Sequence, residues 1–235
     1  DEVDEFVPAY KIGSGDITWI KIIEYIARKQ KPYIIATGAS NIDEVTFAVN
    51  SGYKINQNLS LMQCNTNYSI SPDNFKYINL NVLKTYAKLF PNLVLGLSDH
   101  TAGHATVLGA ITLGARIIEK HFTDDNSREG PDHAFAMNPN SWEEMVLRSK
   151  ELQNSLGIEI KKVEANEKET VILQRRSLRL RKDMGEGSTI SELDLIELRP
   201  CPQDSIPISK INEIIGKRLK KAIKKGGYLK WEDLI

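Results

Sequence analysis

The chain has 235 residues, 41% of them hydrophobic, so it can bury a sizeable core. Lys plus Arg and Asp plus Glu both total 31, and this balance excludes a general electrostatic attraction to nucleic acid or to an acidic membrane surface. The two distant cysteines, Cys64 and Cys201, favour reduced thiols over a disulfide framework, and no run approaches the ~20 apolar residues of a membrane span. We therefore expect a cytoplasmic protein with neither nucleic-acid nor membrane partners.

Up to about residue 150, short β-branched runs alternate with longer runs of helical period. The runs that favour strands are apolar on both faces, which is typical of a parallel sheet covered by helices. The expected strands are 9–14, 32–38, 59–64, 93–100 and 115–122. The expected helices are 16–30, 41–52, 74–90, 104–114 and 141–156. The sequence therefore predicts an α/β fold made of repeated strand–helix units.

The number of units falls short of the eight in a closed TIM (β/α)8 barrel. The opening residues, DEVDEFVPAY, read as the end of a preceding helix and loop. We therefore expect residues 1–156 to be the C-terminal part of such a barrel, and the chain to be the C-terminal portion of a longer protein. Alternatively, the sheet is completed in some other way. Open sheet edges would make the isolated chain associate or aggregate.

A second region begins near Gly157, where the regular alternation stops. Residues 157–174 form a charged stretch that favours a mostly helical linker. Residues 175–235 contain short apolar runs separated by Gly-containing turns, which predict a small, separate domain rich in strands and turns.

Polar residues recur at the C-terminal ends of the expected strands, which converge on one ligand-binding face in a (β/α) barrel. They are Lys11, Ser14, Asp16, Thr37, Gly38, Asn65, Thr66, Tyr68, Ser98, Asp99, His100, Glu119, Lys120 and His121. Hydroxyls and backbone N–H groups near helix starts, with one cation, suit a phosphate or carboxylate. The candidates for that role are Lys11, Ser14, Thr37, Gly38, Thr66 and Ser98. The alternative is helix N-capping, by Asp16, Asn41 and Thr101.

All four histidines fall between positions 100 and 133, and His100 and His121 end neighbouring strands. Two imidazoles at adjacent strand tips can share one divalent ion and leave positions open for substrate and water. The alternative is that each histidine only forms hydrogen bonds in a polar barrel mouth. For His104, in the first turn of the next helix, we favour that alternative.

Several motifs, in this order, resemble the sialic acid synthase (N-acetylneuraminate synthase) family, which includes legionaminate and pseudaminate synthases. They are YKIGSGDI, IIATG, LMQCNTNY, LGLSDHTAGH, LGARIIEKHF and GPDHAF. The later stretches LRPCPQDSIP, IIGKRL and GGYLKWEDL resemble the small SAF domain, which is similar in fold to type III antifreeze proteins. The resemblance covers essentially the whole chain.

The resemblance implies a metal-dependent, C–C bond-forming transferase of carbohydrate biosynthesis. Such an enzyme condenses phosphoenolpyruvate with N-acetylmannosamine or a related N-acetylated sugar aldehyde, giving a nine-carbon 2-keto acid and phosphate. The cofactor implied is a divalent metal, Mn²⁺ or Mg²⁺. A domain-swapped homodimer is also implied. The family's early strands, with a Glu and a second phosphate-binding Lys, have no counterpart here, so we expect the isolated chain to be inactive.

The resemblance also implies roles for individual residues. His100 and His121 match the metal ligands, and Asp132 matches an acidic residue close to the metal water and the sugar. The substrate-binding positions implied are Lys11, Ser14, Asp16, Thr66, Tyr68, Ser98 and Arg199. Asp16 stands where the family often has Glu, and Ala36 stands where Ser is often found. Arg199 matches an arginine that one subunit places over the barrel mouth of its dimer partner.

Two other readings remain open. A metal-dependent pyruvate aldolase or hydrolase can use the same barrel, although such hydrolases usually offer more His and carboxylate ligands. In a non-catalytic alternative, the partial barrel is a scaffold and the SAF-like domain binds glycan or a partner. An aldolase would use pyruvate and release no phosphate, whereas a binding module would bind sugar without turnover.

Overall fold

The computed structural model describes residues 1–68 and 71–235. It divides into two compact units, Asp1–Ile158 and Glu159–Ile235. The segment expected to be a linker therefore belongs mostly with the second unit. None of the helices in these described ranges combines the length and the apolarity that spanning a bilayer requires.

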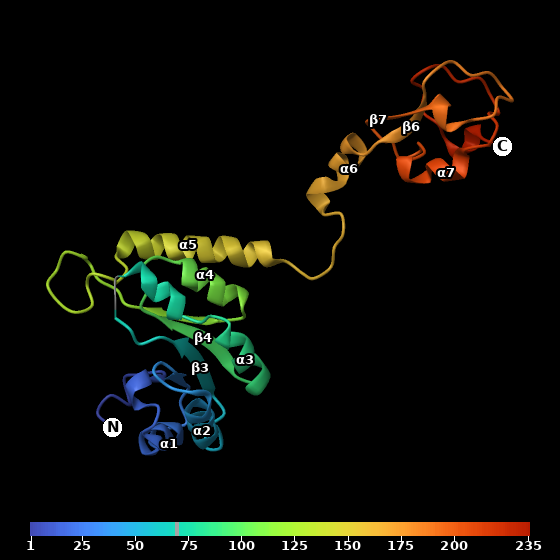
Figure 1. The fold of residues 1–235 in the computed structure, drawn as a ribbon. Helices are drawn as coiled ribbons and strands as arrows, with labels where there is room; N and C mark the ends of the chain where they lie inside the picture. Colours follow the sequence, from blue (N-terminus) through green and yellow to red (C-terminus); the bar gives the residue numbers. More distant parts are fainter. Residues whose placement is uncertain (69–70) are drawn as a thin grey trace. The chain divides into compact units, whose positions relative to one another are not determined.

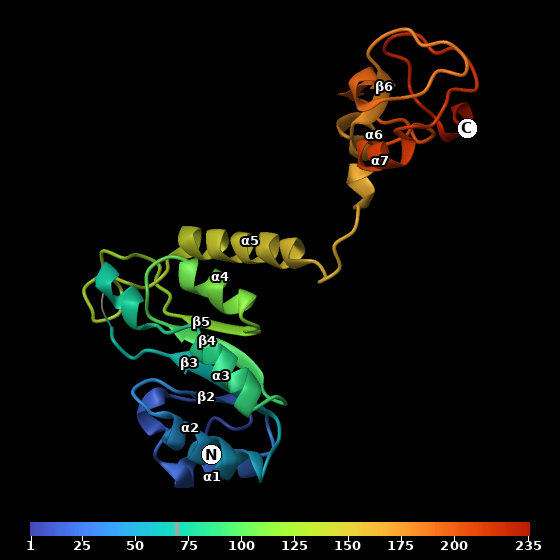
Figure 2. The ribbon, with the colours of Figure 1, turned by 45° about the vertical axis from the view of Figure 1, so that its right-hand side comes forward.

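The first unit is built on a five-stranded parallel sheet with the order β1-β2-β3-β4-β5 (Figures 1 and 2). The strands are β1 Tyr10–Ile12, β2 Tyr33–Ala36, β3 Leu59–Cys64, β4 Val94–Asp99 and β5 Ile117–Lys120. The helices are α1 Ile20–Arg28, α2 Ile42–Tyr53, α3 Val82–Leu89, α4 Ala105–Thr112 and α5 Pro139–Leu156. Strands in sequence order, each followed by a helix, are the arrangement of a (β/α) barrel wall, which confirms the predicted fold class.

One expected helix is interrupted. The stretch predicted as a single helix over 74–90 forms a short 3-10 helix, Pro72–Tyr77, followed by α3. Asn79, between the two, has a φ of +50°, a left-handed conformation that an α-helix cannot accommodate. The hydrophobic period continues through the break, so the sequence pattern alone does not reveal it.

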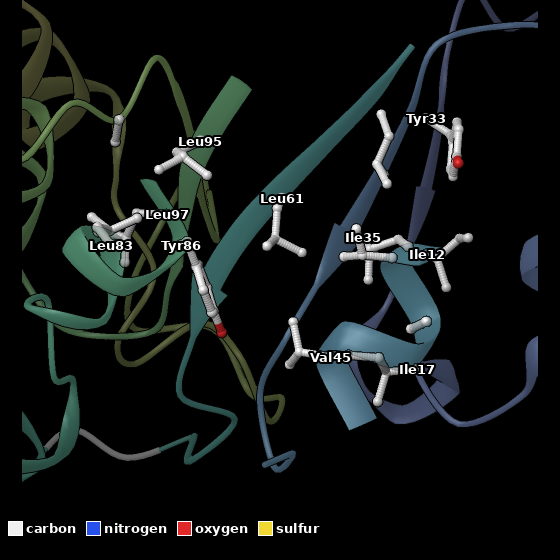
Figure 3. Close-up of a cluster of buried hydrophobic side chains, with 14 of the residues drawn as sticks. Ile12, Ile17, Tyr33, Ile35, Val45, Leu61, Leu83, Tyr86, Leu95 and Leu97 are labelled. Carbon is white, nitrogen blue, oxygen red and sulfur yellow. The ribbon is translucent and has the colours of Figure 1, made fainter. Parts of the chain in front are cut away.

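The outer face of the sheet, defined by Ile12, Ile35, Leu61 and Leu95, carries the main core. These four residues follow one another across neighbouring strands. Figure 3 shows them with apolar side chains of the covering helices, such as Val45. Fully burying an aliphatic side chain of this size stabilises the fold by about 1.5–3 kcal/mol. Strand alternation turns the intervening residues toward the opposite, inner face.

Two helices of this unit begin at asparagines whose side chains cap the first turn. Asn41 Oδ1 accepts hydrogen bonds at 3.0 Å from the backbone N–H groups of Asp43 and Glu44, and the backbone N–H of Asn41 donates to Glu44 Oε2 at 2.8 Å. Asn138 forms the same reciprocal arrangement with Ser141 at the start of α5. Such caps satisfy N–H groups that otherwise lack a partner and fix where each helix begins. The predicted capping role of Asn41 is confirmed.

The second unit is small and rich in turns. Its regular elements are η3 Ala165–Glu167, α6 Lys168–Gln174, β6 Ser177–Leu180, η4 Glu192–Asp194, β7 Leu195–Leu198, η5 Ile208–Lys210, α7 Ile211–Ile214 and η6 Trp231–Asp233. Strands β6 and β7 pair antiparallel. Leu178, Leu180, Ile206 and Leu229 are fully buried in its core. The predicted small domain of strands and turns is confirmed.

This unit also contains an internal repeat that links residues 182–195 with residues 221–234. Met184 and Ile223 occupy matching positions, and each donates its backbone N–H to the carbonyl of the other, at 3.0 and 2.9 Å. The ion pairs that recur at matching positions are Lys182–Asp194 and Lys221–Asp233, both 2.6 Å long. The reciprocal backbone bonds indicate that the two segments are related by an approximate two-fold axis.

Candidate active site

The inner face of the sheet becomes polar toward the C-terminal ends of the strands. Cys64, Ser98 and Glu119 lie side by side on β3, β4 and β5, as the parallel register requires. Cys64 and Ser98 are buried, at 6% and 3% exposure. The strand ends therefore present a row of polar side chains on the inner face, while the apolar core residues Ile12, Ile35, Leu61 and Leu95 lie on the outer face.

Lys11 and Glu119 form an ion pair across this inner face. Lys11 Nζ lies 2.9 Å from Glu119 Oε1, although β1 and β5 are at opposite ends of the sheet. The contact shows that the sheet curves strongly toward its inner side. The second carboxylate oxygen of Glu119, Oε2, is buried and has no hydrogen-bond partner among the described residues. Glu119 thus has an acceptor available for a ligand hydroxyl or water.

Ser14, Gly38 and Thr66 meet beside the same row. The backbone N–H of Gly38 donates to Ser14 Oγ at 2.9 Å. A Cβ atom on Gly38 would lie 2.5 Å from Thr66 Cγ2 and 2.9 Å from Ser14 Oγ, so only glycine permits this approach. The structure therefore brings together three of the residues predicted to hold a phosphate or carboxylate.

Cys64 lies in the middle of this group. Burial by itself raises the pKa of its thiol, but hydrogen bonds with His100, Ser14 and Ser98 outweigh burial, and the pKa lies below its ordinary value. For His100, burial lowers the pKa, but hydrogen bonds with Cys64 and with the carbonyl of Asn65 raise it above its ordinary value. The sequence predicts only that Cys64 is a reduced thiol. Its position at the end of an expected strand was the signal that it belongs to the site.

His100 and His121 lie next to each other, with ring centroids 5.0 Å apart. His100 Nδ1 lies 2.7 Å from the carbonyl oxygen of Asn65, and His121 Nδ1 lies 3.2 Å from Asp132 Oδ2. Oxygen partners at Nδ1 orient the rings and leave Nε2 as the metal-binding nitrogen of each. An imidazole nitrogen lies about 2 Å from a bound zinc ion, so this ring spacing fits one shared ion of similar size.

The donor set around the two histidines is small. Within residues 1–68 and 71–235, no group of three or more His, Cys, Asp or Glu residues is arranged to hold a metal. Two imidazoles with oxygen-bonded Nδ1 atoms fit a divalent ion that keeps several positions for substrate and water. They do not fit a closed structural zinc site, which needs four protein ligands.

Two aromatic side chains flank the histidines. The ring of Tyr68 lies 4.4 Å from that of His100 and 5.7 Å from that of His121. The ring of Phe135 lies 5.0 Å from that of His121 and is 5% exposed. Tyr68, one of the predicted substrate-binding residues, therefore lies beside the histidine pair, and Phe135 lines the site next to His121.

The loop after β5 is closed at its base. Met137 N–H donates to the carbonyl of His121 at 2.8 Å, and Thr123 N–H donates to the carbonyl of Met137 at 2.9 Å. Inside the loop, Asn126 Nδ2 donates to the carbonyls of His133 and Ala136, both at 2.8 Å. These bonds hold the end of the polar loop next to its beginning at the tip of β5. Asp132 and Phe135 therefore lie beside His121.

Three strand-end residues expected in the mouth, Thr37, Asp99 and Lys120, face the other way. The hydroxyl of Thr37 donates to the carbonyl of Met62 and accepts from Tyr86 of α3, so it lies under the helices and not beside the phosphate candidates. Lys120 points to the outer face as well, where it pairs with Asp99. Strand alternation is the reason, because neighbouring residues in a strand point to opposite faces.

Two capping predictions were wrong. Asp16 lies in η1 (Ser14–Asp16) and is exposed, and no side-chain cap bond forms at η1 or at α1. Thr101 does not cap α4, whose N-cap is His104; its hydroxyl bonds to Asp99 instead. Asp16 therefore stays at the edge of the strand-end group with its carboxylate in solvent.

Arg199 belongs to the second unit, so the structure does not place it with the other predicted residues. Its Nε donates to the carbonyl of Gln174 at 2.7 Å. The carbonyl of Arg199 accepts from Arg179 Nη2 at 3.1 Å, and the Arg179 guanidinium stacks 4.0 Å from the ring centre of Tyr228. The backbone at Arg199 is therefore held firmly while its side chain remains exposed.

Comparisons with known proteins agree with this arrangement. Residues 1–161 match the model of the NeuB family, and residues 175–235 match that of the SAF domain. The N,N'-diacetyllegionaminic acid synthase of Legionella pneumophila is 37% identical, over 97% of this chain and 64% of that protein. The pseudaminic acid synthase of Helicobacter pylori is 32% identical, over 97% of this chain and 65% of that protein.

Solved structures show the same likeness. The N-acetylneuraminic acid synthetase of Leptospira borgpetersenii superposes with a TM-score of 0.64 at 28% identity, covering 71% of this chain and 57% of that one. A spore coat polysaccharide biosynthesis protein from Chromobacterium violaceum shares the fold, with a TM-score of 0.70 at 19% identity, over 97% of this chain and 68% of that one. The chain thus spans less than two thirds of the length of several relatives that it matches. Because the match to the family model extends over residues 1–161, the chain belongs to the NeuB family.

Proposed function

We propose that the protein is a sugar-acid synthase that condenses phosphoenolpyruvate with an N-acetylated sugar aldehyde and releases phosphate. The supporting observation is that two groups of residues lie on one face of the sheet. One is a set of candidate phosphate ligands, Lys11, Ser14, Thr66 and Ser98, which we call the anion cradle, and the other is the pair of His100 and His121. Cys64 lies between the two groups and interacts with both. Several relatives are named as synthases of acidic sugars, which supports the same class of reaction.

The cradle has the chemistry to hold the phosphate and carboxylate of phosphoenolpyruvate. Lys11 supplies a cation, Ser14 and Thr66 supply hydroxyls, and Ser98 adds another at the buried end of β4. Charge-assisted hydrogen bonds are shorter and stronger than neutral ones. Holding two reactants in one orientation gives an effective concentration far above their concentrations in solution.

We further propose that Mn²⁺ or Mg²⁺ binds through His100 and His121. Such an ion polarises a carbonyl oxygen as a Lewis acid, which here would be that of the aldehyde. The protein's own contribution is to orient both rings, through Asn65 and Asp132, before the ion arrives. Replacing either histidine by alanine should abolish tight Mn²⁺ binding in calorimetry, and unchanged affinity in both variants would refute the assignment.

Asp132 has a second proposed role. One carboxylate oxygen is engaged by His121, and the side chain is 51% exposed, so the other oxygen can accept a proton from water. A water positioned there can attack the carbon that bears the phosphate, once the new C–C bond has formed. Glu119 Oε2, on the inner face of the sheet, is a further acceptor proposed for a sugar hydroxyl.

Arg199 is proposed to act from a partner subunit in a homodimer. Its exposed side chain on a fixed backbone suits a group that reaches another surface. Mixing full-length Arg199→Ala with a His121→Ala variant should restore some activity through hybrid dimers. No restoration at any mixing ratio would argue against the shared site.

One assay decides the proposed function. Phosphate release from phosphoenolpyruvate by the full-length protein is measured with N-acetylmannosamine and with diacetamido 6-deoxy sugars. Release that depends on an aldehyde and on Mn²⁺ is expected. Use of pyruvate without phosphate release would identify an aldolase, and sugar binding without turnover would identify a binding module.

A further inference from the structure

Asp99 and Lys120 form a buried ion pair next to the two histidines but on the other face of the sheet. Asp99 directly precedes His100, and Lys120 directly precedes His121. Lys120 Nζ lies 2.6 Å from Asp99 Oδ2, and the side chains are 1% and 0% exposed. Burying two charges carries a large desolvation cost, which is offset only where the geometry is good and the remaining hydrogen bonds are made.

Those hydrogen bonds are made by two threonines. The hydroxyl of Thr101 lies 2.8 Å from Asp99 Oδ2, and that of Thr106 lies 2.6 Å from the same oxygen. The backbone N–H of Thr101 donates to Asp99 Oδ1 at 3.2 Å. Lys120 also donates to the carbonyl of Thr101, at 2.6 Å. The residues on both sides of His100 are thereby tied to the residue before His121.

We propose that the network of Asp99, Thr101, Thr106 and Lys120 positions the two histidines for metal binding, an inference that rests on the proposed metal site. The register pairs Asp99 with Lys120 across β4 and β5, so the network fixes the separation of the two strand tips. Binding groups must be held within about 0.5 Å of the productive geometry. The network lies on the opposite face, where it leaves the inner face free for ligands.

Four variants of the full-length protein test the proposal, with Mn²⁺ affinity measured by calorimetry. Thr106→Val removes one hydroxyl from the network and should weaken Mn²⁺ binding about 10-fold, at the lower end of the range for groups that orient metal ligands. Lys120→Met should weaken it further. Tyr86→Phe is the matched control, because Tyr86 is 3% exposed and its hydroxyl donates to Thr37 on the same outer face, not to the network. It should bind Mn²⁺ as the wild type does. His100→Ala defines the loss of the site.

The outcomes separate the two proposals. Lys120→Met leaves Asp99 without its counter-ion and can unfold the chain, so Thr106→Val, checked by circular dichroism, carries the decision. Wild-type Mn²⁺ affinity in folded Thr106→Val, with affinity lost in His100→Ala, overturns the positioning role and leaves the metal site standing. Unchanged affinity in His100→Ala overturns both. Equal losses in Thr106→Val and Tyr86→Phe would reveal a general effect of stability and also overturn the positioning role.

Discussion

Two lysine–carboxylate pairs at the tip of β5 (Ile117–Lys120) have opposite characters. Glu119 and Lys120 are neighbours in the chain, yet Glu119 pairs with Lys11 on the inner face and Lys120 pairs with Asp99 on the outer face. The inner pair is 35% and 40% exposed, and one oxygen of Glu119 has no partner in the described residues. The outer pair is almost completely buried, and both oxygens of Asp99 are hydrogen-bonded.

The difference teaches how one strand serves both structure and function. A saturated, buried pair has no capacity for a ligand, and removing one partner leaves a charge in a dry environment. A half-exposed pair with a free acceptor contributes little to folding, but it can exchange partners when a ligand arrives. The outer pair should therefore control stability and the inner pair should control binding.

The largest effect is expected from Lys120→Met. It leaves the carboxylate of Asp99 buried without a counter-ion, which costs about 3–5 kcal/mol of unfolding free energy. Lys11→Met is the matched variant on the inner face, and it should cost less than about 1 kcal/mol, because exposed pairs contribute little. Urea denaturation of the two variants side by side measures both quantities. Equal losses would contradict the distinction between the pairs.

The next effect concerns ligand binding by the inner pair. Lys11→Met should weaken phosphoenolpyruvate binding by about 10- to 100-fold, because a charge-assisted hydrogen bond contributes about 1.5–3 kcal/mol. Calorimetry with phosphoenolpyruvate gives the affinity, and Lys31→Met is a control lysine in an ion pair with Asp4, outside the site. If both variants bind like the wild type, Lys11 is only a structural partner of Glu119.

Gly38→Ala sharpens the assignment of the inner face. The added Cβ would lie 2.5 Å from Thr66 Cγ2, so Thr66 or Ser14 must move, at a cost of about 1–3 kcal/mol in overpacking. The affinity for phosphoenolpyruvate should fall because Thr66 or Ser14 is displaced. Gly15→Ala is the matched control, since a Cβ there meets nothing within 4 Å. A Gly38→Ala variant with unchanged phosphoenolpyruvate affinity would exclude this corner from the binding site.

The smallest effect on stability is expected from a third ion pair, Lys182–Asp194, in the second unit. The side chain of Asp194 is 9% exposed and that of Lys182 is 68% exposed. Hydrogen bonds from Lys182 and Ser191 lower the pKa of Asp194 to about 2. A lowered pKa means that the carboxylate stabilises the fold above its ordinary pKa near 4, and that this contribution is lost as the pH falls toward about 2.

Asp194→Asn should therefore destabilise the second unit by about 1 kcal/mol at pH 7, comparable to the loss of a helix cap. Thermal unfolding from pH 7 to pH 2 should show the difference from wild type shrinking below about pH 4. Asp73→Asn, which removes an ion pair exposed on both sides, serves as the control. A difference that does not change with pH would contradict the assignment.

Much of the fold followed from local patterns. Apolar runs followed by amphipathic runs predicted the parallel sheet and its helices, and the change of pattern near Gly157 predicted the second domain. The break at Asn79 was missed, because a single left-handed residue leaves the hydrophobic period intact. The repeat in the second unit was also missed, although the DLI stretches at 194–196 and 233–235 were a visible signal.

The sequence by itself determined which residue types gather at the strand ends, because parallel strands direct their C-terminal ends to one edge. It could not determine which face each residue takes. Strands that are apolar on both faces carry no alternation of polarity to mark the helix-covered side. Only the packing of helices on Ile35 and Leu61 decided that Glu119 faces inward and Lys120 outward.

Contacts between distant segments were likewise decided by the tertiary structure. Lys11 and Glu119 are 108 positions apart, and only the curvature of the sheet brings them together. Asp132 reaches His121 because hydrogen bonds close the base of its loop, and those bonds join groups that no short motif relates. Local propensity acts over a few residues, whereas these contacts depend on how the whole sheet is wrapped by its helices.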